Sequence, residues 1–229
     1  MANIIHIETS TDICSVALSS DGQCLTEEVD CKGPSHAKVL AGFVREVVSF
    51  ADSHALPLDA VAVSSGPGSY TGLRIGLSTA KGLCYGRDLR LLSVPTLQLL
   101  CTPVLLHEEL PEDAVLCPMI DARRMEVYTA VYDRALRPLE DVHARVVEAD
   151  TLDKWLAERP VYFFGGGADK CREMLEERGA HFVDGIRPLA RDMFPLAEMA
   201  LLRGRTEDVA YFVPNYLKDF VPGKAKSLI

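Results

Sequence analysis

The chain has 229 residues, of which 48% are hydrophobic and 25% charged, and its formal net charge at pH 7 is −9. This composition is typical of a globular protein with a substantial apolar core, and it excludes a disordered chain. The acidic balance disfavours autonomous binding to DNA or RNA, because an acidic surface repels phosphates. A role in nucleic-acid chemistry would need a local basic patch or a basic partner.

Seven cysteines are scattered along the chain without a CxxC pair. The odd count and the spacing favour reduced thiols in a cytoplasmic protein over a disulfide framework. The first residues show no secretory signal. The longest uncharged stretch, Leu91–Leu106, contains two prolines and is too short to span a bilayer. We therefore expect a soluble cytoplasmic protein that does not bind membranes.

The first half of the chain alternates strand-like and helix-like segments. Apolar runs bounded by turn residues predict strands at Ile4–Glu8, Cys14–Ser19, Gln23–Val29, Leu58–Ser64 and Leu89–Val94. Helical periodicity predicts helices from Ser35 to about Ala55, from Thr71 to about Arg87 and from Pro95 to about Leu106. This order of elements indicates an α/β fold.

The second half repeats the pattern of the first. Leu116–Asp121 and Glu126–Tyr132 predict a second hairpin, and Val161–Phe164 leads through three glycines into an apolar-periodic run that ends near Arg178. The repeat predicts two α/β lobes with mixed sheets, one over residues 1–107 and one over residues 108–229. The alternative is a single mixed α/β domain without duplication.

The loop Ser65–Gly72 is the first candidate for phosphate binding, because glycines between a strand and a helix can point backbone N–H groups at an anion. The spacing matches neither a Rossmann loop nor a P-loop, since Thr71 stands where the first needs a glycine or alanine and the second a glycine followed by lysine. Phosphate binding and mere tight packing both remain open for this loop.

Metal and nucleophilic sites are not predicted. The six histidines are at least 18 residues apart, and Cys24, Cys31 and His36 fit no usual zinc spacing. The serines beside the glycine loop lack the nucleophile-elbow motif. Glu8 and Asp121 end corresponding strands, so they are either a pair of active-site carboxylates or solvated turn residues.

The first two predicted helices carry more apolar or small residues than a helix covering one sheet needs. On the second helix, small residues collect on one side, and each mid-helix glycine costs roughly 1 kcal/mol relative to alanine. We interpret this side as a surface for close packing against another chain, with the first helix as the alternative neighbour. The predicted partner interface consists of His36, Leu40, Phe43, Val44, Val47, Thr71, Gly72, Ile75, Gly76, Thr79, Leu83 and Gly86.

Four segments together resemble the TsaB (YeaZ) family, the dimerisation subunits of the bacterial complex that makes threonylcarbamoyladenosine in tRNA. They are residues 3–19 (NIIHIETSTDICSVALS), 64–83 (SSGPGSYTGLRIGLSTAKGL), 120–128 (IDARRMEVY) and 213–217 (VPNYL). The GPGSYTGLRIG block is the most specific of them. The resemblance implies an actin-like ATPase (ASKHA) fold of two RNase-H-like lobes.

The resemblance also implies a non-catalytic scaffold that pairs through its first two helices with a TsaD-like transferase, joined by a TsaE-like ATPase that uses ATP. TsaD holds a metal with a helix-borne histidine pair, whereas the matching stretch here, TLQLLCTPVLL, has none. We therefore expect no catalytic residue, metal or cofactor in this chain. We also expect a homodimer when the chain is alone, and contact with tRNA only through the complex.

A vestigial nucleotide loop is expected at Glu8, Thr9, Ser10, Gly66 and Gly68. The family usually has Asp where this chain has Glu8, which argues against a magnesium–nucleotide role. Two alternatives remain at this point: an ATP-dependent small-molecule kinase of the same fold, and a metallopeptidase-like protein.

Overall fold

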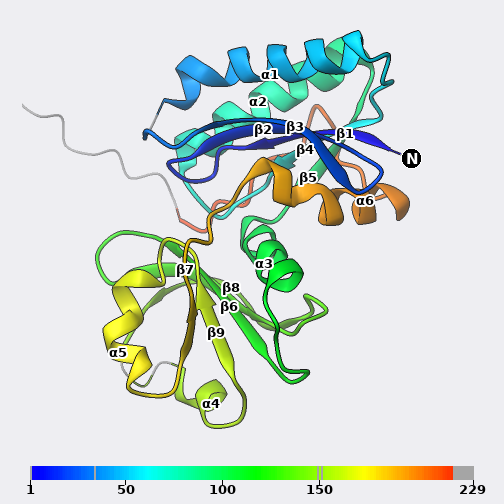
Figure 1. Ribbon diagram of the computed structural model, residues 1–229. Helices are drawn as coiled ribbons and strands as arrows, with labels where there is room; N and C mark the ends of the chain where they lie inside the picture. The colour runs from blue at the N-terminus through cyan, green and yellow to red at the C-terminus, as the bar shows by residue number, and fades with distance from the viewer. Residues whose placement is uncertain (1, 34, 149, 151, 219–229) are drawn as a thin grey trace, which may run out of the picture.

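The computed structural model describes residues 2–33, 35–148, 150 and 152–218, which form two lobes (Figure 1). The first sheet has five strands in the order β3-β2-β1-β4-β5, and the second has five in the order β10-β9-β6-β7-β8. The strands of the first lobe are β1 Asn3–Glu8, β2 Cys14–Ser20, β3 Gln23–Asp30, β4 Ala60–Ser64 and β5 Arg90–Val94. Those of the second are β6 Val115–Asp121, β7 Glu126–Tyr132, β8 Pro138–Val146, β9 Val161–Phe164 and β10 His181–Val183.

The two sheets have the same topology. In each, three strands form an antiparallel meander, and two later strands add in parallel on the other side of the first strand. This repeat confirms the predicted duplication and excludes the single undivided domain. It is the actin-like ATPase arrangement of two RNase-H-like lobes.

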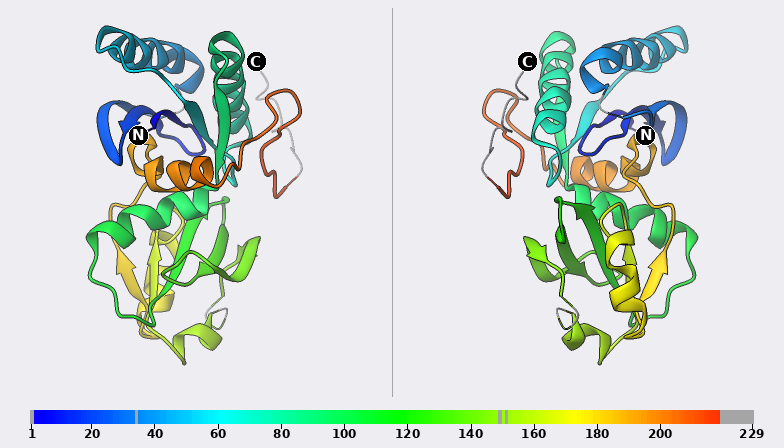
Figure 2. Two further views of the ribbon diagram at one scale, coloured as in Figure 1. Left: turned by 90° about the vertical axis from the view of Figure 1, so that its right-hand side faces the viewer. Right: turned by 90° about the vertical axis from the view of Figure 1, so that its left-hand side faces the viewer.

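Helices cover both faces of the first sheet. The long helices α1 His36–Ser53 and α2 Tyr70–Arg87 lie on the outer face, while α6 Phe194–Leu202 lies on the face turned toward the second lobe (Figures 1 and 2). The central strand β1 is therefore buried at every residue. Its odd-numbered isoleucines pack with the outer helices, and Ile4 packs with Leu99 and Ala197 on the inner face.

The helices of the second lobe are shorter. Between the lobes lies α3 Thr96–His107, and the rest of the second half contains α4 Asp153–Leu156, η1 Asp169–Cys171, α5 Arg172–Glu176 and η2 Ala190–Met193. The single helix predicted up to Arg178 is thus a short 3-10 turn followed by a five-residue helix. The other predicted strands and helices are confirmed within about two residues of their ends.

The chain crosses back to the first lobe after β10. The backbone N–H of Ala190 donates to Ser15 Oγ over 2.9 Å, α6 contacts β5 and β1, and the N–H of Glu207 donates to the Leu91 carbonyl over 2.8 Å. The division of the chain into an N-terminal lobe over residues 1–107 and a C-terminal lobe over residues 108–229 stays a prediction. By contact, η2 and α6 lie against the first sheet.

Candidate nucleotide loop and partner-binding face

The carboxyl end of β1 brings together the residues of the expected nucleotide loop. Glu8 is fully buried, and its Oε1 accepts hydrogen bonds of 2.5 Å from both the backbone N–H and the hydroxyl of Ser10. Burial raises the pKa of Glu8 from 4.5 to about 7, although Ser10 and the nearby Ser64 hydroxyl oppose that rise. The second carboxyl oxygen has no hydrogen-bond partner among the described residues. Glu8 is thus a carboxyl group that titrates near neutrality without access to solvent.

The glycine loop lies directly on this turn. The Ser69 N–H donates to the Ser10 carbonyl over 2.6 Å. A Cβ added to Gly68 would lie 2.3 Å from the same carbonyl oxygen, and a Cβ at Gly72 would lie 2.1 Å from the Thr9 carbonyl oxygen. No side chain fits at such distances. The glycines therefore allow two backbone segments of the same chain to touch.

The second lobe repeats this contact. A Cβ at Gly165 would lie 2.5 Å from the Met119 carbonyl oxygen, and one at Gly167 would lie 2.8 Å from the Ile120 carbonyl carbon. Because both lobes use glycines at the same place in the repeat, close packing explains them without a ligand. In the first lobe, a phosphate would have to displace the Glu8 carboxyl group from the N–H of Ser10.

The second predicted carboxylate, Asp121, has a different environment. Partial burial tends to raise its pKa, but the Lys170 ammonium at 2.5 Å and the Arg123 N–H at 2.9 Å hold that pKa below its ordinary value. Glu8 is enclosed and Asp121 is engaged in an ion pair. The hypothesis of two carboxylates acting together on a substrate therefore has no geometric support.

His36, another candidate from the sequence, forms its polar contact within the chain. His36 is buried, and its Nε2 lies 2.9 Å from the Thr11 carbonyl oxygen. Within the described residues, no group of three or more His, Cys, Asp or Glu side chains could hold a metal ion. In the same part of the chain, no helix is long and apolar enough to cross a membrane.

Five of the twelve predicted interface residues are buried inside the chain itself: His36, Leu40, Val47, Gly72 and Gly76. A Cβ at Gly76 would lie 2.2 Å from Thr9 Oγ1, so this glycine, like Gly72, serves packing on the β1–β2 turn. The prediction that these two glycines admit a foreign backbone is wrong. A stripe of small residues indicates close packing, but the sequence does not distinguish a segment of the same chain from a partner chain as the neighbour.

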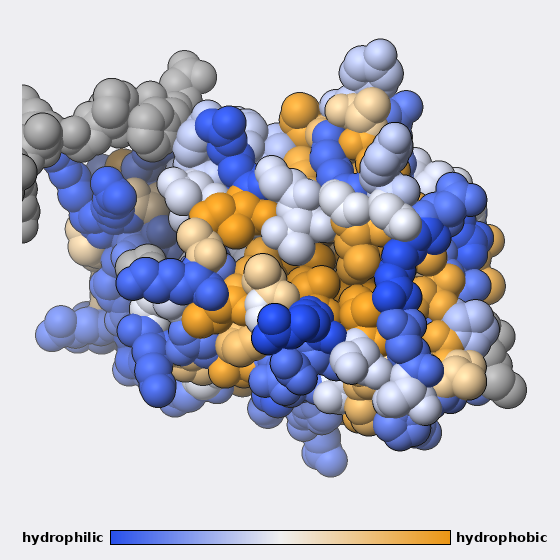
Figure 3. All heavy atoms as spheres, turned by 90° about the horizontal axis from the view of Figure 1, so that it is seen from above, coloured by the Kyte–Doolittle hydropathy of each residue, from blue (hydrophilic) through white to orange (hydrophobic). Residues whose placement is uncertain are grey.

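The other predicted residues remain accessible, wholly or in part. They are Phe43, Val44, Thr71, Ile75, Thr79, Leu83 and Gly86, and we call them the α1/α2 face. Figure 3 looks down on the outer helices and shows hydrophobic side chains gathered between polar ones there. Gly82 and Gly86 have no atom within 4 Å of an added Cβ, so the surface beside Leu83 is open. Apolar side chains and open glycines together suit close helix packing.

Comparison with known proteins identifies the family. The family model described as TsaD, tRNA N6-adenosine threonylcarbamoyltransferase, matches residues 32–221. The tRNA threonylcarbamoyladenosine biosynthesis protein TsaB of Escherichia coli K12 is 30% identical over 96% of this chain and 96% of its own. The chain belongs to the TsaB family. The TsaB protein of Haemophilus influenzae is 32% identical, over 96% of this chain and 95% of its own.

Solved structures agree with the TsaB assignment. A Pseudomonas aeruginosa protein described as similar to peptidase YEAZ superposes with a TM-score of 0.80 at 26% identity, covering 95% of this chain and 100% of that one. YeaZ from the same organism superposes with a TM-score of 0.74 at 26% identity over the same shares of the two chains. The TsaB fold is thus shared along nearly the whole length.

Two glycine substitutions separate the roles of the buried and the open glycines. Gly72→Ala places a methyl group against a backbone oxygen, so we expect a loss of about 2 kcal/mol or more of unfolding free energy. Gly82→Ala meets nothing and improves helix propensity, so stability should rise by up to about 1 kcal/mol. Urea unfolding of both variants measures the difference. Equal stability of the two would contradict the packing role of Gly72.

The buried carboxyl group of Glu8 makes stability depend on pH. Because its pKa is raised, the contribution of Glu8 to the free energy of unfolding is fully present below pH 4.5 and is lost as the pH rises through about 7. Glu8→Gln removes this titration, so its stability relative to wild type should grow by roughly 3 kcal/mol between pH 4 and pH 8. Denaturant titrations of both proteins across that pH range measure the difference. If the unfolding free energies of wild type and Glu8→Gln changed in parallel with pH, the pKa of Glu8 would not be raised.

Proposed function

We propose that this chain is a non-catalytic scaffold in the biosynthesis of threonylcarbamoyladenosine in tRNA. In this proposal it binds and activates a TsaD-like transferase in the cytoplasm, and a TsaE-like ATPase joins the complex. The observation that carries the proposal is the α1/α2 face, where half-buried apolar side chains lie beside the exposed Gly82 and Gly86. Such a face buries its apolar area when a second helix pair lies on it.

The contacts within the expected nucleotide loop favour a scaffold over a kinase. The N–H of Ser10 is bonded to Glu8, and Gly68 lies against the Ser10 carbonyl. A small-molecule kinase needs these groups free to hold phosphates. In the free chain, the same α1/α2 face would pair two copies, because a twofold axis lets one patch face itself.

Charge placed on the α1/α2 face tests the proposed partner contact. Leu83→Asp buries a carboxylate on association, so affinity for the TsaD-like subunit should fall about 30-fold or more. Because Leu83 also packs against the core of the first lobe, the unfolding midpoint of the variant is measured alongside, and the affinity is determined at a temperature where the variant is fully folded. The matched control is Ser49→Asp, which adds the same group at an exposed position of α1 among polar residues. Calorimetry with the purified transferase measures both.

Reconstitution tests the activity. The chain alone should modify no tRNA, and modification should appear when the chain, the TsaD-like protein, the TsaE-like protein and ATP are combined. Transferase activity of the isolated chain, or wild-type affinity of Leu83→Asp, would contradict the proposal.

A further inference from the structure

One flank of α2, next to the α1/α2 face, carries tyrosines and cations. Tyr70, Arg74, Lys81 and Tyr85 are spaced by four, seven and four residues, so they lie along one side of the helix. Tyr85 is 88% exposed. The Arg74 guanidinium lies 5.3 Å from the centre of the Tyr70 ring, an arrangement that holds both side chains flat on the surface.

The segment 205–218, which we call the strap, runs beside this flank (Figure 2). The Lys81 ammonium donates to the Ala210 carbonyl over 3.0 Å, and the rings of Tyr216 and Tyr70 lie 4.7 Å apart. Tyr211 on the strap is 83% exposed. Four of the seven tyrosines of the chain therefore lie on the flank and the strap together.

An ion pair and hydrogen bonds continue this row onto the second lobe. Lys218, at the end of the strap, forms an ion pair with Glu126, whose backbone N–H donates to the Arg123 carbonyl over 3.1 Å. The Lys170 ammonium donates to the Arg124 carbonyl over 2.7 Å. Arg123 and Arg124 are exposed, and neither forms an ion pair with a described residue. We call the whole row, from Tyr85 to Lys170, the tyrosine–cation track.

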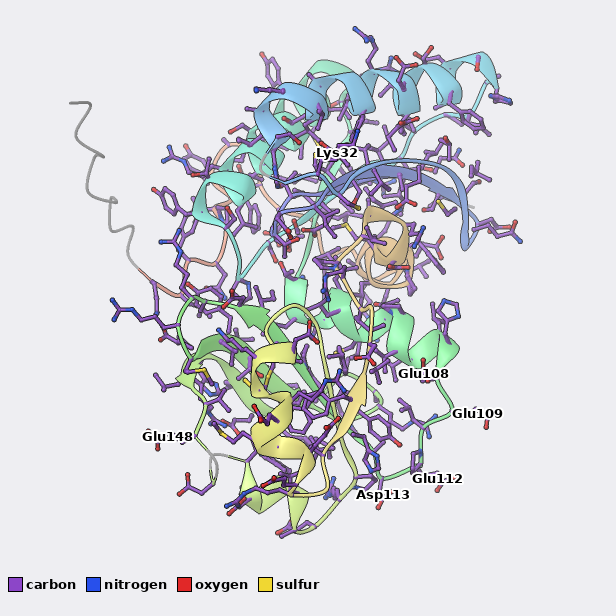
Figure 4. The ribbon with its side chains drawn as sticks, turned by 60° about the vertical axis from the view of Figure 1, so that its left-hand side comes forward. Lys32, Glu108, Glu109, Glu112, Asp113 and Glu148 are labelled. Atoms are coloured by element: carbon purple, nitrogen blue, oxygen red, sulfur yellow. The ribbon has the colours of Figure 1, made fainter. Side chains whose placement is uncertain are left out.

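The track is locally positive on an acidic protein. Its cations are Arg74, Lys81, Arg123, Arg124, Lys170 and Lys218. The acids in contact with it within the described residues include Asp121, Glu126 and Asp208. The loop between α3 and β6 carries acidic side chains that lie on the opposite side of the molecule from the strap (Figure 4); they are Glu108, Glu109, Glu112 and Asp113. Glu148, which Figure 4 shows on the side of the strap, is an exception, so the excess of cations is local to the track.

We propose that the tyrosine–cation track is the surface on which the substrate tRNA lies in the assembled complex; the inference rests on the proposed function. Exposed tyrosine rings stack unpaired bases, and arginine and lysine contact phosphates. At 1.5 Å per residue, α2 from Tyr70 to Tyr85 spans about 22 Å, enough for several nucleotides. The net charge of −9 explains why the track would serve within a complex and not alone.

Two variants probe the two chemistries of the track in the reconstituted complex. Tyr85→Ala removes a stacking ring, and Arg124→Asn removes a phosphate contact while tolerating the positive φ of 51° at that residue. Each should raise the KM for tRNA about tenfold and leave kcat and affinity for the transferase unchanged. Arg124→Asn should also reduce the salt dependence of tRNA binding by about one ion.

Three controls sharpen the test. Tyr85→Phe keeps the ring and should show the wild-type KM for tRNA. Arg45→Ser on α1 and Leu202→Ala on α6 change exposed residues outside the track, so they too should leave this KM unchanged. Unchanged KM in both track variants would overturn the inference. A loss of transferase affinity in place of tRNA affinity would overturn it in favour of a protein contact. If the wild-type complex fails to assemble, the proposed function itself is wrong, and the track loses its role with it.

Discussion

The contact between the β1–β2 turn and the glycine loop sets the geometry of the first lobe. Two carbonyl oxygens, those of Thr9 and Ser10, lie where side chains at Gly72 and Gly68 would otherwise stand. The hydroxyl of Thr9 adds a hydrogen bond of 2.9 Å to the Gly72 carbonyl. This contact seats the first turn of α2 on the end of β1. The carboxyl end of β1 is therefore packed against the glycine loop of the same chain.

Seating α2 in this way divides its surface into three. One side, with Leu73, Leu77 and Ala80, packs on the sheet. A second side, with Ile75, Leu83 and the open glycines, joins α1 in the apolar face. The third side carries the tyrosines beside the strap. One helix thus combines the core of the lobe with the two surfaces to which we assign a protein partner and an RNA.

The sequence allowed both lobes to be predicted because period-two hairpins and strand–glycine–helix transitions are local signals. Strand β8 was missed since its side chains are mostly exposed or half-buried and alternate weakly, and α6 was missed since FPLAEMALL is apolar on every side apart from Glu198. Gly72 and Gly76 were misassigned because their neighbour, Thr9, is more than 60 residues away in sequence. The burial of Glu8 could not be predicted either, since it depends on the same distant contact.

The open glycines have a consequence for the free subunit. Each glycine within a helix weakens it by about 1 kcal/mol relative to alanine, and Gly82 and Gly86 have no neighbouring atoms that compensate. The Arg87–Asp52 ion pair ties the last turn of α2 to α1, but the surface at the two glycines stays uncovered until another molecule lies on it. In the free subunit, local opening of α2 is therefore expected to cost less free energy around these glycines than in the turns that pack on the β1–β2 turn.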